Sequence, residues 1–270
     1  MKKTGFIGCG KMAKAIIKGI LLSGLIKSEN LIASKSSPDN LEEISKELGI
    51  KITLDNKEVA EFAEIIFVAV KPNQVENVLA EIKDYITPQK LIVSVAAGVK
   101  TAYMESILSQ QTKIVRVMPN TPVLVNEGMA GICRSKCAND KDIEQVQKIF
   151  NSIGKSVVID ESQMDIVTAI SGSGPAFFYK VINDIARAGE KLGMDYEKAL
   201  LLSIQTALGS AKMAMNRNIS MEELIANVAT KGGCTRVGAD VMEGINGGVK
   251  TSELFYEVIK STAEKARSLG

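Results

Sequence analysis

Two glycines one residue apart, near the N-terminus, are the first residues whose spacing could support chemistry. Gly8 and Gly10 follow the short apolar run Thr4 to Ile7 and precede a segment with helical periodicity, and Ala13 completes a GxGxxA pattern. In this pattern the first glycine permits a tight turn, the second lets a pyrophosphate approach the backbone, and the small third residue lets helix and strand pack closely. The pattern predicts a turn that binds a dinucleotide on the N–H groups of a helix N-terminus. The alternative is that the glycines only join a strand to a helix.

The segment after the second predicted strand indicates which dinucleotide would bind. A ribose with a free 2′-hydroxyl usually meets an Asp or Glu there, about 20 residues beyond the glycines. In this chain Ser34, Lys35 and Ser36 occupy that place, and the first carboxylate is that of Asp39. Hydroxyl and ammonium groups suit a 2′-phosphate, so we predict NADPH as the cofactor, with weaker use of NADH. For Lys35 the alternative is a lysine that is merely solvated in a loop.

Two further strand ends carry candidate contacts to the ribose and the nicotinamide. Lys71 and Pro72 follow one buried strand, and Ala96 to Gly98 follow the next. The carboxyl ends of parallel strands line the ligand crevice of a doubly wound sheet, although these residues would also suit ordinary loops. The cofactor-binding residues predicted from these strand ends are Phe6, Ile7, Gly8, Cys9, Gly10, Lys11, Met12, Ser34, Lys35, Ser36, Ala69, Val70, Lys71, Pro72, Ala96, Ala97 and Gly98.

The second half of the chain contains another glycine turn, in the segment NVATKGGCTRVGAD (residues 227–240). Gly232 and Gly233 precede Thr235 in a turn that leads into a predicted helix. Backbone N–H groups at a helix N-terminus suit a carboxylate, and the Thr235 hydroxyl can donate or accept one more hydrogen bond. The alternative for Thr235 is a structural helix cap. The segment SGSGPAFF (171–178) also places two glycines and a proline before a long helix, which a helix start does not require.

The elements that must position these residues change character at about residue 160. Before it, short β-branched runs alternate with amphipathic helical segments, which indicates βαβ units and a mainly parallel sheet. After it, the sequence predicts helices alone. The expected strands are 4–7, 31–33, 65–70, 91–95, 114–118, 129–133 and 156–159. The expected helices are 11–23, 38–48 (with Ser37 and Pro38 as N-cap and first residue), 73–83, 101–108, 176–192, 195–215, one starting at Ser220, and 251–269. We therefore predict a Rossmann-type α/β domain over residues 1–160 and an all-helical domain over 161–270.

One helical segment predicts self-association. The stretch ALLLSIQTALGSA (199–211) is apolar on more than one side of a helix, so one packing face cannot cover it. In a region this small, burial against a second subunit is favoured over the alternative, a central helix within one bundle.

Composition excludes several classes of function. The chain of 270 residues contains no histidine, which rules out an imidazole base, a His-ligated zinc and a Ser-His-Asp triad. The net charge of +2, with lysines scattered among glutamates, argues against binding to nucleic acid or a membrane surface. No apolar stretch is long enough to span a bilayer, the N-terminus does not resemble a signal peptide, and the four cysteines show neither disulfide nor metal-site spacing. A cytoplasmic protein without a metal is expected.

Taken together, the motifs resemble those of the pyrroline-5-carboxylate reductase family. The matching pieces span essentially the whole chain: FIGCGKMA, AVKP, AAGV, MPNTPV, SGSGPAF and, most specifically, LIANVATKGGCTRVGADVME (224–243). The resemblance implies a helical domain that interlocks with its twin in a homodimer, sometimes assembled further into a ring of dimers. It implies Asn56 as an additional adenosine-side contact. Near the substrate or nicotinamide it implies Glu161, Asn227, Cys234 and Thr235, beside the substrate-binding N–H groups predicted above for Gly232 and Gly233, with the Thr235 hydroxyl as the catalytic group that aligns the substrate.

The absence of histidine fits the reaction that the resemblance implies. Reduction of a carbonyl usually needs an acid to protonate the forming alkoxide, whereas hydride addition to a protonated imine gives a neutral amine directly. We therefore predict NADPH-dependent reduction of the C=N bond of 1-pyrroline-5-carboxylate to L-proline, the last step of proline biosynthesis. The alternatives are a reductase of another imine or hydroxy acid on the same fold, and a non-catalytic NADPH-binding regulator.

Overall fold

The computed structural model describes residues 2–216, 218–245 and 247–268, which form two compact units. One unit extends to Ser173 and includes the chain from Thr262 onward, and the other is Gly174–Ser261. Helix α12 begins in the second unit and ends in the first. The predicted domain limits at residues 160 and 161 stay a prediction.

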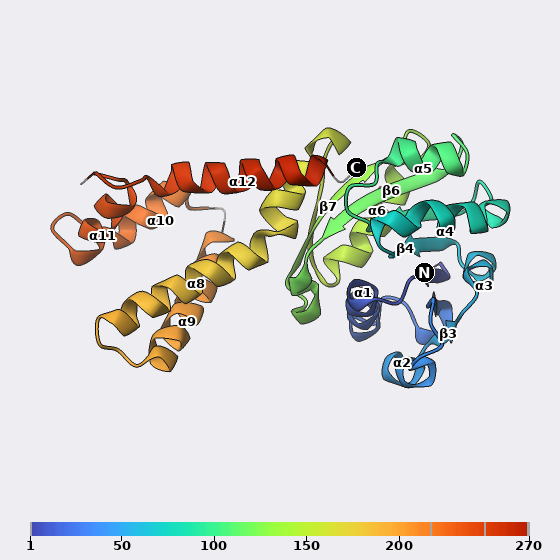
Figure 1. The fold of residues 1–270 in the computed structure, drawn as a ribbon, viewed down its shortest axis with the longest axis horizontal. Coiled ribbons are helices and arrows are strands. Elements are labelled where there is room, and N and C mark those ends of the chain that lie inside the picture. The colour runs from blue at the N-terminus through green and yellow to red at the C-terminus, as the bar shows by residue number, and fades with distance from the viewer. Residues whose placement is uncertain (1, 217, 246, 269–270) are drawn as a thin grey trace. The chain divides into compact units, whose positions relative to one another are not determined.

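The first unit is built on an eight-stranded sheet with the order β3-β2-β1-β4-β5-β6-β7-β8. Strands β3, β4, β6 and β7 of this sheet are labelled in Figure 1. All neighbouring strands are parallel except β6 and β7. Strands β1, β2, β4 and β5 have four residues each, and all of these residues are buried, as expected for strands covered on both faces. The strands are β1 (Thr4–Ile7), β2 (Leu31–Ser34), β3 (Lys51–Thr53), β4 (Ile65–Val68), β5 (Leu91–Ser94), β6 (Lys113–Pro119), β7 (Gly128–Arg134) and β8 (Gly154–Val158).

Helices cover both faces of this sheet and form two apolar cores. One core joins the sheet to α1, α2 and α6, and it includes Phe6 stacked on Phe67 with ring centroids 4.5 Å apart. The other core joins the opposite face to α3, α4 and α5. The helices are α1 (Lys11–Leu22), α2 (Leu41–Leu48), α3 (Asn56–Phe62), α4 (Val75–Ile82), α5 (Thr101–Ile107), α6 (Asp140–Asn151) and the short α7 (Met164–Val167). This arrangement confirms the predicted Rossmann-type, doubly wound sheet.

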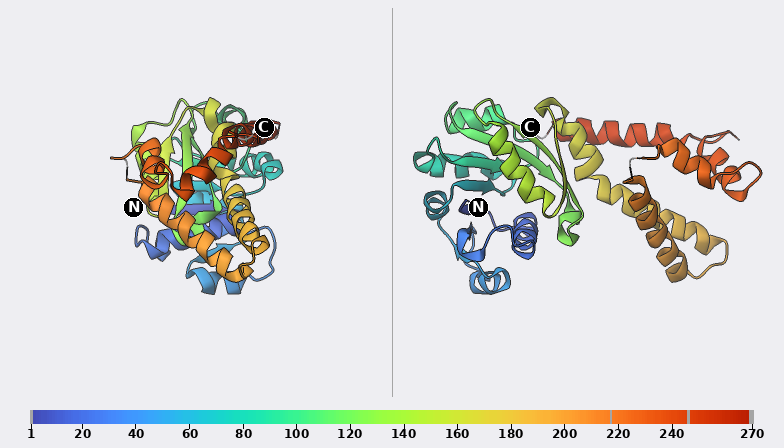
Figure 2. Two further views of the ribbon diagram at one scale, coloured as in Figure 1. Left: turned by 90° about the vertical axis from the view of Figure 1, so that its left-hand side faces the viewer. Right: turned by 180° about the vertical axis from the view of Figure 1, so that it is seen from behind.

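Helices are the only regular secondary structure among the described residues of the second unit. Helices α8 and α9 lie side by side as a hairpin, which both views of Figure 2 show. Side chains cap the helix starts: Asp195 accepts the N–H of Lys198 at 3.1 Å, and Ser220 accepts that of Glu223 at 3.1 Å. The helices are α8 (Gly174–Lys191), α9 (Tyr196–Ala214), α10 (Met221–Val228), α11 (Cys234–Met242) and α12 (Thr251–Arg267). A π-helical turn, Thr168–Gly172, precedes α8.

Four expectations about the elements need correction. Strand β3 and helices α3 and α6 were not expected, and α2 begins at Leu41 rather than at Pro38. Asn40, with a φ of 57°, precedes α2 in a left-handed conformation, so the Ser37–Pro38 pair lies outside the helix. The predicted end of the last helix, at Leu269, lies outside the described residues.

Two classes of feature are absent from the described part of the chain. No helix there is long and apolar enough to cross a membrane. Groups of three or more His, Cys, Asp or Glu side chains that could hold a metal ion are also absent there.

Candidate functional site

The turn after β1 requires glycine at its first position. Gly8 has a φ of +94°, and a Cβ atom there would lie 2.7 Å from Val70 Cγ1 and 2.8 Å from the Ala69 carbonyl oxygen. Its N–H donates to the Ser34 carbonyl at 3.2 Å, which joins the turn to the end of β2. The turn can therefore pass between two strand ends only because no side chain is present.

Gly10 has a different reason to be glycine. A Cβ atom there would meet no protein atom within 4 Å, so protein packing does not require the absence of a side chain. Gly10 is the N-cap of α1, makes no side-chain cap, and is followed by a first turn without an acidic residue. The first-turn N–H groups of a helix have no acceptor within the helix. The open space above them thus fits an anion such as a pyrophosphate.

A cleft of about 410 Å³ opens in front of this turn. Its walls come from the glycine turn, the end of β2, the start of α3, the segment after β4, and α4. The residues that line it are Gly8, Cys9, Gly10, Ser34, Lys35, Ser36, Leu54, Asn56, Ala69, Val70, Lys71, Gln74, Asn77, Val78 and Glu81. Ten of these are among the residues predicted to bind the cofactor, and the structure brings them together in one cleft.

The other predicted cofactor residues do not line this cleft. The Phe6 and Ile7 side chains are fully buried in the two cores, so only their backbone could approach a ligand. Ala96 and Gly98 are buried and Ala97 is half-buried after β5, and Gly98 has a φ of +79°. The remaining three lie beside the cleft: Lys11 and Pro72 are exposed, and Met12 packs against the first core. Contacts from these residues to a cofactor stay a prediction.

A chain of hydrogen bonds crosses the end of the cleft next to β2. The fully buried Ser34 hydroxyl donates to Asn56 Oδ1 at 2.6 Å, and Asn56 Nδ2 donates to Glu81 Oε2 at 2.7 Å. The serine predicted to meet a 2′-phosphate is therefore already bonded to the protein. Two other polar residues at the end of β2 also line the cleft: Lys35, which donates to the Asp39 carbonyl oxygen, and the exposed Ser36.

Glu81 is a cleft residue that the sequence analysis missed. It lies near the C-terminal end of α4, far along the chain from the glycine turn, and no motif marks it. Only the pairing of β1 with β4, followed by the return of α4 over the sheet, brings it to Asn56.

Cys9 lies in the same turn, but its side chain packs into the first core. The thiol is buried against the first core, and burial raises its pKa. A thiol with a raised pKa is a weak nucleophile at neutral pH, so we assign Cys9 a packing role.

Glu161, predicted to lie near the substrate, has both carboxylate oxygens bonded within the first unit. Oε1 accepts the Thr101 N–H at 2.8 Å and an Arg116 Nη1–H at 3.2 Å, and Oε2 accepts the Thr101 hydroxyl at 2.6 Å. These bonds tie the residue after β8 to the first turn of α5 and to the middle of β6. Burial, together with the nearby Glu161 carboxylate, raises the pKa of Cys133 to about 12. A direct role of Glu161 toward substrate stays a prediction.

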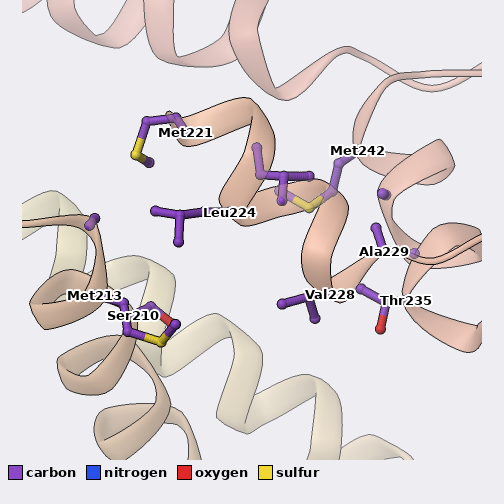
Figure 3. A pocket seen from close by; sticks show the side chains of 12 residues that line it. Ser210, Met213, Met221, Leu224, Val228, Ala229, Thr235 and Met242 are labelled. Atoms are coloured by element: carbon purple, nitrogen blue, oxygen red, sulfur yellow. The ribbon is translucent and has the colours of Figure 1, made fainter. Parts of the chain in front are cut away.

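Thr235 lies in the second unit, in a groove of about 550 Å³ between α9, α10 and α11. Figure 3 shows Met213, Leu224 and Val228 around this groove, with the Thr235 hydroxyl at one end of the group. The lining is otherwise almost entirely apolar. Asn227 and Cys234, which were also predicted to be near substrate, are exposed on the same two helices, α10 and α11.

The glycine turn before α11 differs in detail from the expectation. The Gly233 N–H was expected to be open to a ligand, but it donates to the Thr230 carbonyl at 3.0 Å. Gly232 has a φ of +79°, which explains the glycine at that position. Gly233 is the N-cap of α11, so helix geometry leaves the N–H groups of Cys234 and Thr235 without an intrahelical acceptor. The N–H groups that a carboxylate could reach in this turn are therefore those of Cys234 and Thr235.

The doubly wound sheet and the open glycine turn define a Rossmann-fold dinucleotide-binding protein. The family model described as NADP oxidoreductase, coenzyme F420-dependent, matches residues 3–98, and that for pyrroline-5-carboxylate reductase dimerisation matches residues 161–269. The chain belongs to the pyrroline-5-carboxylate reductase family.

Individual relatives match along nearly their whole length. The chain is 37% identical over 269 residues to pyrroline-5-carboxylate reductase of Methanosarcina acetivorans, covering 100% of this chain and 98% of the relative. It is 37% identical over 242 residues to the Escherichia coli enzyme of that name, covering 90% of each. Among solved structures, a pyrroline-5-carboxylate reductase from Coxiella burnetii has a TM-score of 0.93 at 32% identity, covering 100% of this chain and 98% of that one. The Plasmodium falciparum pyrroline carboxylate reductase with NADP bound has a TM-score of 0.86 at 35% identity, with the same coverage.

Proposed function

We propose that the protein reduces 1-pyrroline-5-carboxylate to L-proline with NADPH, as the last step of proline biosynthesis. The observation that carries the proposal is the full-length membership of the pyrroline-5-carboxylate reductase family, in a chain whose nucleotide cleft and KGGCT turn are both intact.

The cleft residues fit NADPH. NADPH, when bound, supplies the hydride for the reduction. The N–H groups of the first turn of α1 bind the pyrophosphate over the open face of Gly10. Lys35 and Ser36 bind the 2′-phosphate, and Asn56 binds the adenosine ribose. NADH binds more weakly because it leaves the Lys35 ammonium without an anionic partner.

The second unit orients the substrate. The Thr235 hydroxyl bonds the ring nitrogen or carboxylate of the substrate, and the N–H groups at the start of α11 bind its carboxylate. Asn227, Gly232, Gly233 and Cys234 shape this subsite. The protein then supplies orientation rather than a strong acid or base, because a protonated imine becomes a neutral amine on reduction.

We also propose that the protein acts as a homodimer in the cytoplasm. The second unit exposes many large apolar side chains, among them Leu201, Leu202 and Leu208 of α9, far more than a solvated surface usually carries. The name of the matching family model, which refers to dimerisation, supports the same assignment. The four cysteines are free thiols, as in a reducing compartment. A ring of such dimers is a further proposal, because a dimer is enough to cover the apolar surface.

The test follows the absorbance of NADPH during incubation with 1-pyrroline-5-carboxylate, with identification of L-proline as the product, and repeats the assay with NADH. The expected result is oxidation of NADPH that depends on the substrate and is faster than that of NADH. No oxidation of either cofactor would overturn the enzyme assignment in favour of a nucleotide-binding regulator. Oxidation only with another imine or a hydroxy acid would keep the fold assignment and replace the substrate.

A further inference from the structure

The ribose end of the cleft carries opposite charges on its two walls. Lys35 lies at the end of β2, where a ribose 2′-substituent is expected in this fold, and Glu81 reaches the same end from α4. The Ser34–Asn56–Glu81 hydrogen bonds, of 2.6 Å and 2.7 Å, span the space between these walls. A carboxylate from another element, Glu81 of α4, therefore lines the same cleft as Lys35.

The hydrogen bonds also fix the orientation of the Asn56 amide. A carboxylate can only accept, so Glu81 requires the Nδ2 end of Asn56, and the Ser34 hydroxyl donates to Oδ1. A flipped amide would place Oδ1 against the Glu81 carboxylate. Asn56 thus keeps one N–H of its amide group and one Oδ1 lone pair available at the ribose.

We propose that Glu81 is a specificity-determining residue, whose carboxylate accepts a hydrogen bond from a free ribose 2′-hydroxyl and repels a 2′-phosphate. It opposes Lys35, which attracts the 2′-phosphate. The balance between the two charges sets the preference for NADPH over NADH, and Glu81 is the group that keeps NADH usable. This inference rests on the proposed nucleotide site, but not on the identity of the substrate that is reduced.

The inference is tested by the binding of two nucleotide fragments that differ in the 2′-phosphate, 2′,5′-ADP and 5′-AMP, measured by calorimetry on the full chain. Glu81→Gln removes the charge but keeps an oxygen that can accept from Asn56 Nδ2, so the amide stays oriented. We expect Glu81→Gln to tighten 2′,5′-ADP by about threefold and to weaken 5′-AMP by about threefold, because a repulsion and a charge-assisted hydrogen bond are lost. The ratio of the two dissociation constants then shifts by about tenfold.

The matched control is Glu76→Gln. Glu76 lies on the same helix, but it does not line the cleft, and its carboxylate accepts from the Tyr103 hydroxyl at 2.7 Å. This variant is expected to leave both dissociation constants unchanged. Lys35→Ala gives the opposite shift, because it weakens 2′,5′-ADP far more than 5′-AMP.

An unchanged ratio in Glu81→Gln, or an equal shift in Glu76→Gln, would overturn the role of Glu81. Fragment binding does not involve the imine substrate. A protein that binds both fragments as expected but fails to oxidise NADPH with 1-pyrroline-5-carboxylate would therefore refute the proposed reaction and leave this inference standing. Absence of binding by either fragment to the unaltered protein would refute the inference together with the nucleotide site.

Discussion

Arg116 Nη1 lies 3.2 Å from Glu161 Oε1, and only 4% of the Arg116 side chain is exposed. The arginine comes from the middle of β6, and the glutamate lies just after the last strand of the sheet. The same carboxylate accepts the N–H and the hydroxyl of Thr101, at the start of α5. One glutamate therefore neutralises a buried cation and fastens the helix that follows the Ala96–Gly98 loop.

Replacing this carboxylate by an amide is expected to destabilise the first unit. Glu161→Gln leaves the Arg116 charge buried without a counter-ion, and we expect a loss of about 2 kcal/mol in the free energy of unfolding, reduced from the value for a fully buried pair because Glu161 is partly exposed. The measurement is urea unfolding at fixed protein concentration. The control, Arg134→Gln, breaks the exposed pair with Asp140 and should cost less than about 1 kcal/mol. Equal losses in the two variants would contradict the assignment.

The two glycines of the first turn are expected to fail in different ways. Gly10→Ala places a methyl group in open space, so thermal unfolding of the free protein should not change, while NADPH binding weakens by about tenfold or more because the methyl occupies the path of the pyrophosphate. Gly8→Ala places a methyl group 2.7 Å from Val70 Cγ1 at a positive φ, and should cost about 2 kcal/mol of stability before any ligand is added. Fluorescence titration and calorimetric scanning separate the two effects. If Gly10→Ala bound NADPH with the affinity of the unaltered protein, pyrophosphate binding at this turn would be excluded.

The buried Cys133 thiol predicts a loss of stability at alkaline pH. Its pKa is raised from 9.0 to about 12, so its contribution is fully present below pH 9 and is lost as pH rises, because the unfolded chain ionises the thiol first. Between about pH 8 and about pH 10.5 the unaltered protein should lose about 2 kcal/mol more than Cys133→Ala. Urea unfolding across this range measures the difference. Cys137→Ala, which removes an exposed thiol, serves as the control and should follow the unaltered protein; parallel curves for all three proteins would refute the prediction.

Removal of the Thr235 hydroxyl should impair catalysis without affecting the fold. Thr235→Ala loses a hydrogen bond to the substrate, and kcat/KM for 1-pyrroline-5-carboxylate should fall by about tenfold or more. Thr235→Ser keeps the hydroxyl and should retain most of the activity. NADPH binding and thermal unfolding, measured on both variants, should match the unaltered protein. Unchanged turnover and affinity in Thr235→Ala would exclude the catalytic role.

Charges on α9 should separate the subunits of the proposed dimer. Leu201 and Leu208 lie two helical turns apart on one face of α9, and 68% and 46% of their surfaces are exposed in the single chain. Each leucine buried in an interface contributes about 2 kcal/mol, so Leu201→Glu with Leu208→Glu should yield monomers in sedimentation equilibrium. Leu22→Glu, at a leucine of α1 that is 79% exposed, should remain a dimer. A dimeric double variant would place the interface elsewhere.

Much of the fold could be predicted because its signals are local. Buried parallel strands such as β4 and β5 appear in the sequence as continuous apolar runs. Asp195 and Ser220 are typical N-cap residues, and each indicates the start of a helix. Strand β3, of three residues, lies at the edge of the sheet and is partly solvated, so neither an apolar run nor an alternation marks it. Helices α3 and α6 were missed although their signals are local too, since Asp55 and Asn139 cap their first turns.

The candidate cleft was predictable where it follows strand ends and not where α4 lines it. The spacing of Gly8 and Gly10 is visible in the sequence, and it predicts the turn directly. The roles of Glu81 and Thr101 depend on distant partners. Glu81 bonds to Asn56, 25 residues away, and Thr101 bonds to Glu161, 60 residues away. The hydrogen bond of the Ser34 hydroxyl could not be predicted for the same reason, since no local pattern connects Ser34 with Asn56.

Every residue that lines the nucleotide cleft falls between Gly8 and Glu81, within the segment matched by the NADP oxidoreductase family model, whereas the match to the reductase-specific model begins at residue 161. Substitutions that alter the cleft and substitutions in the KGGCT turn therefore fall in separate stretches of the gene. A single recombination event between those stretches would exchange one set of residues and leave the other unchanged.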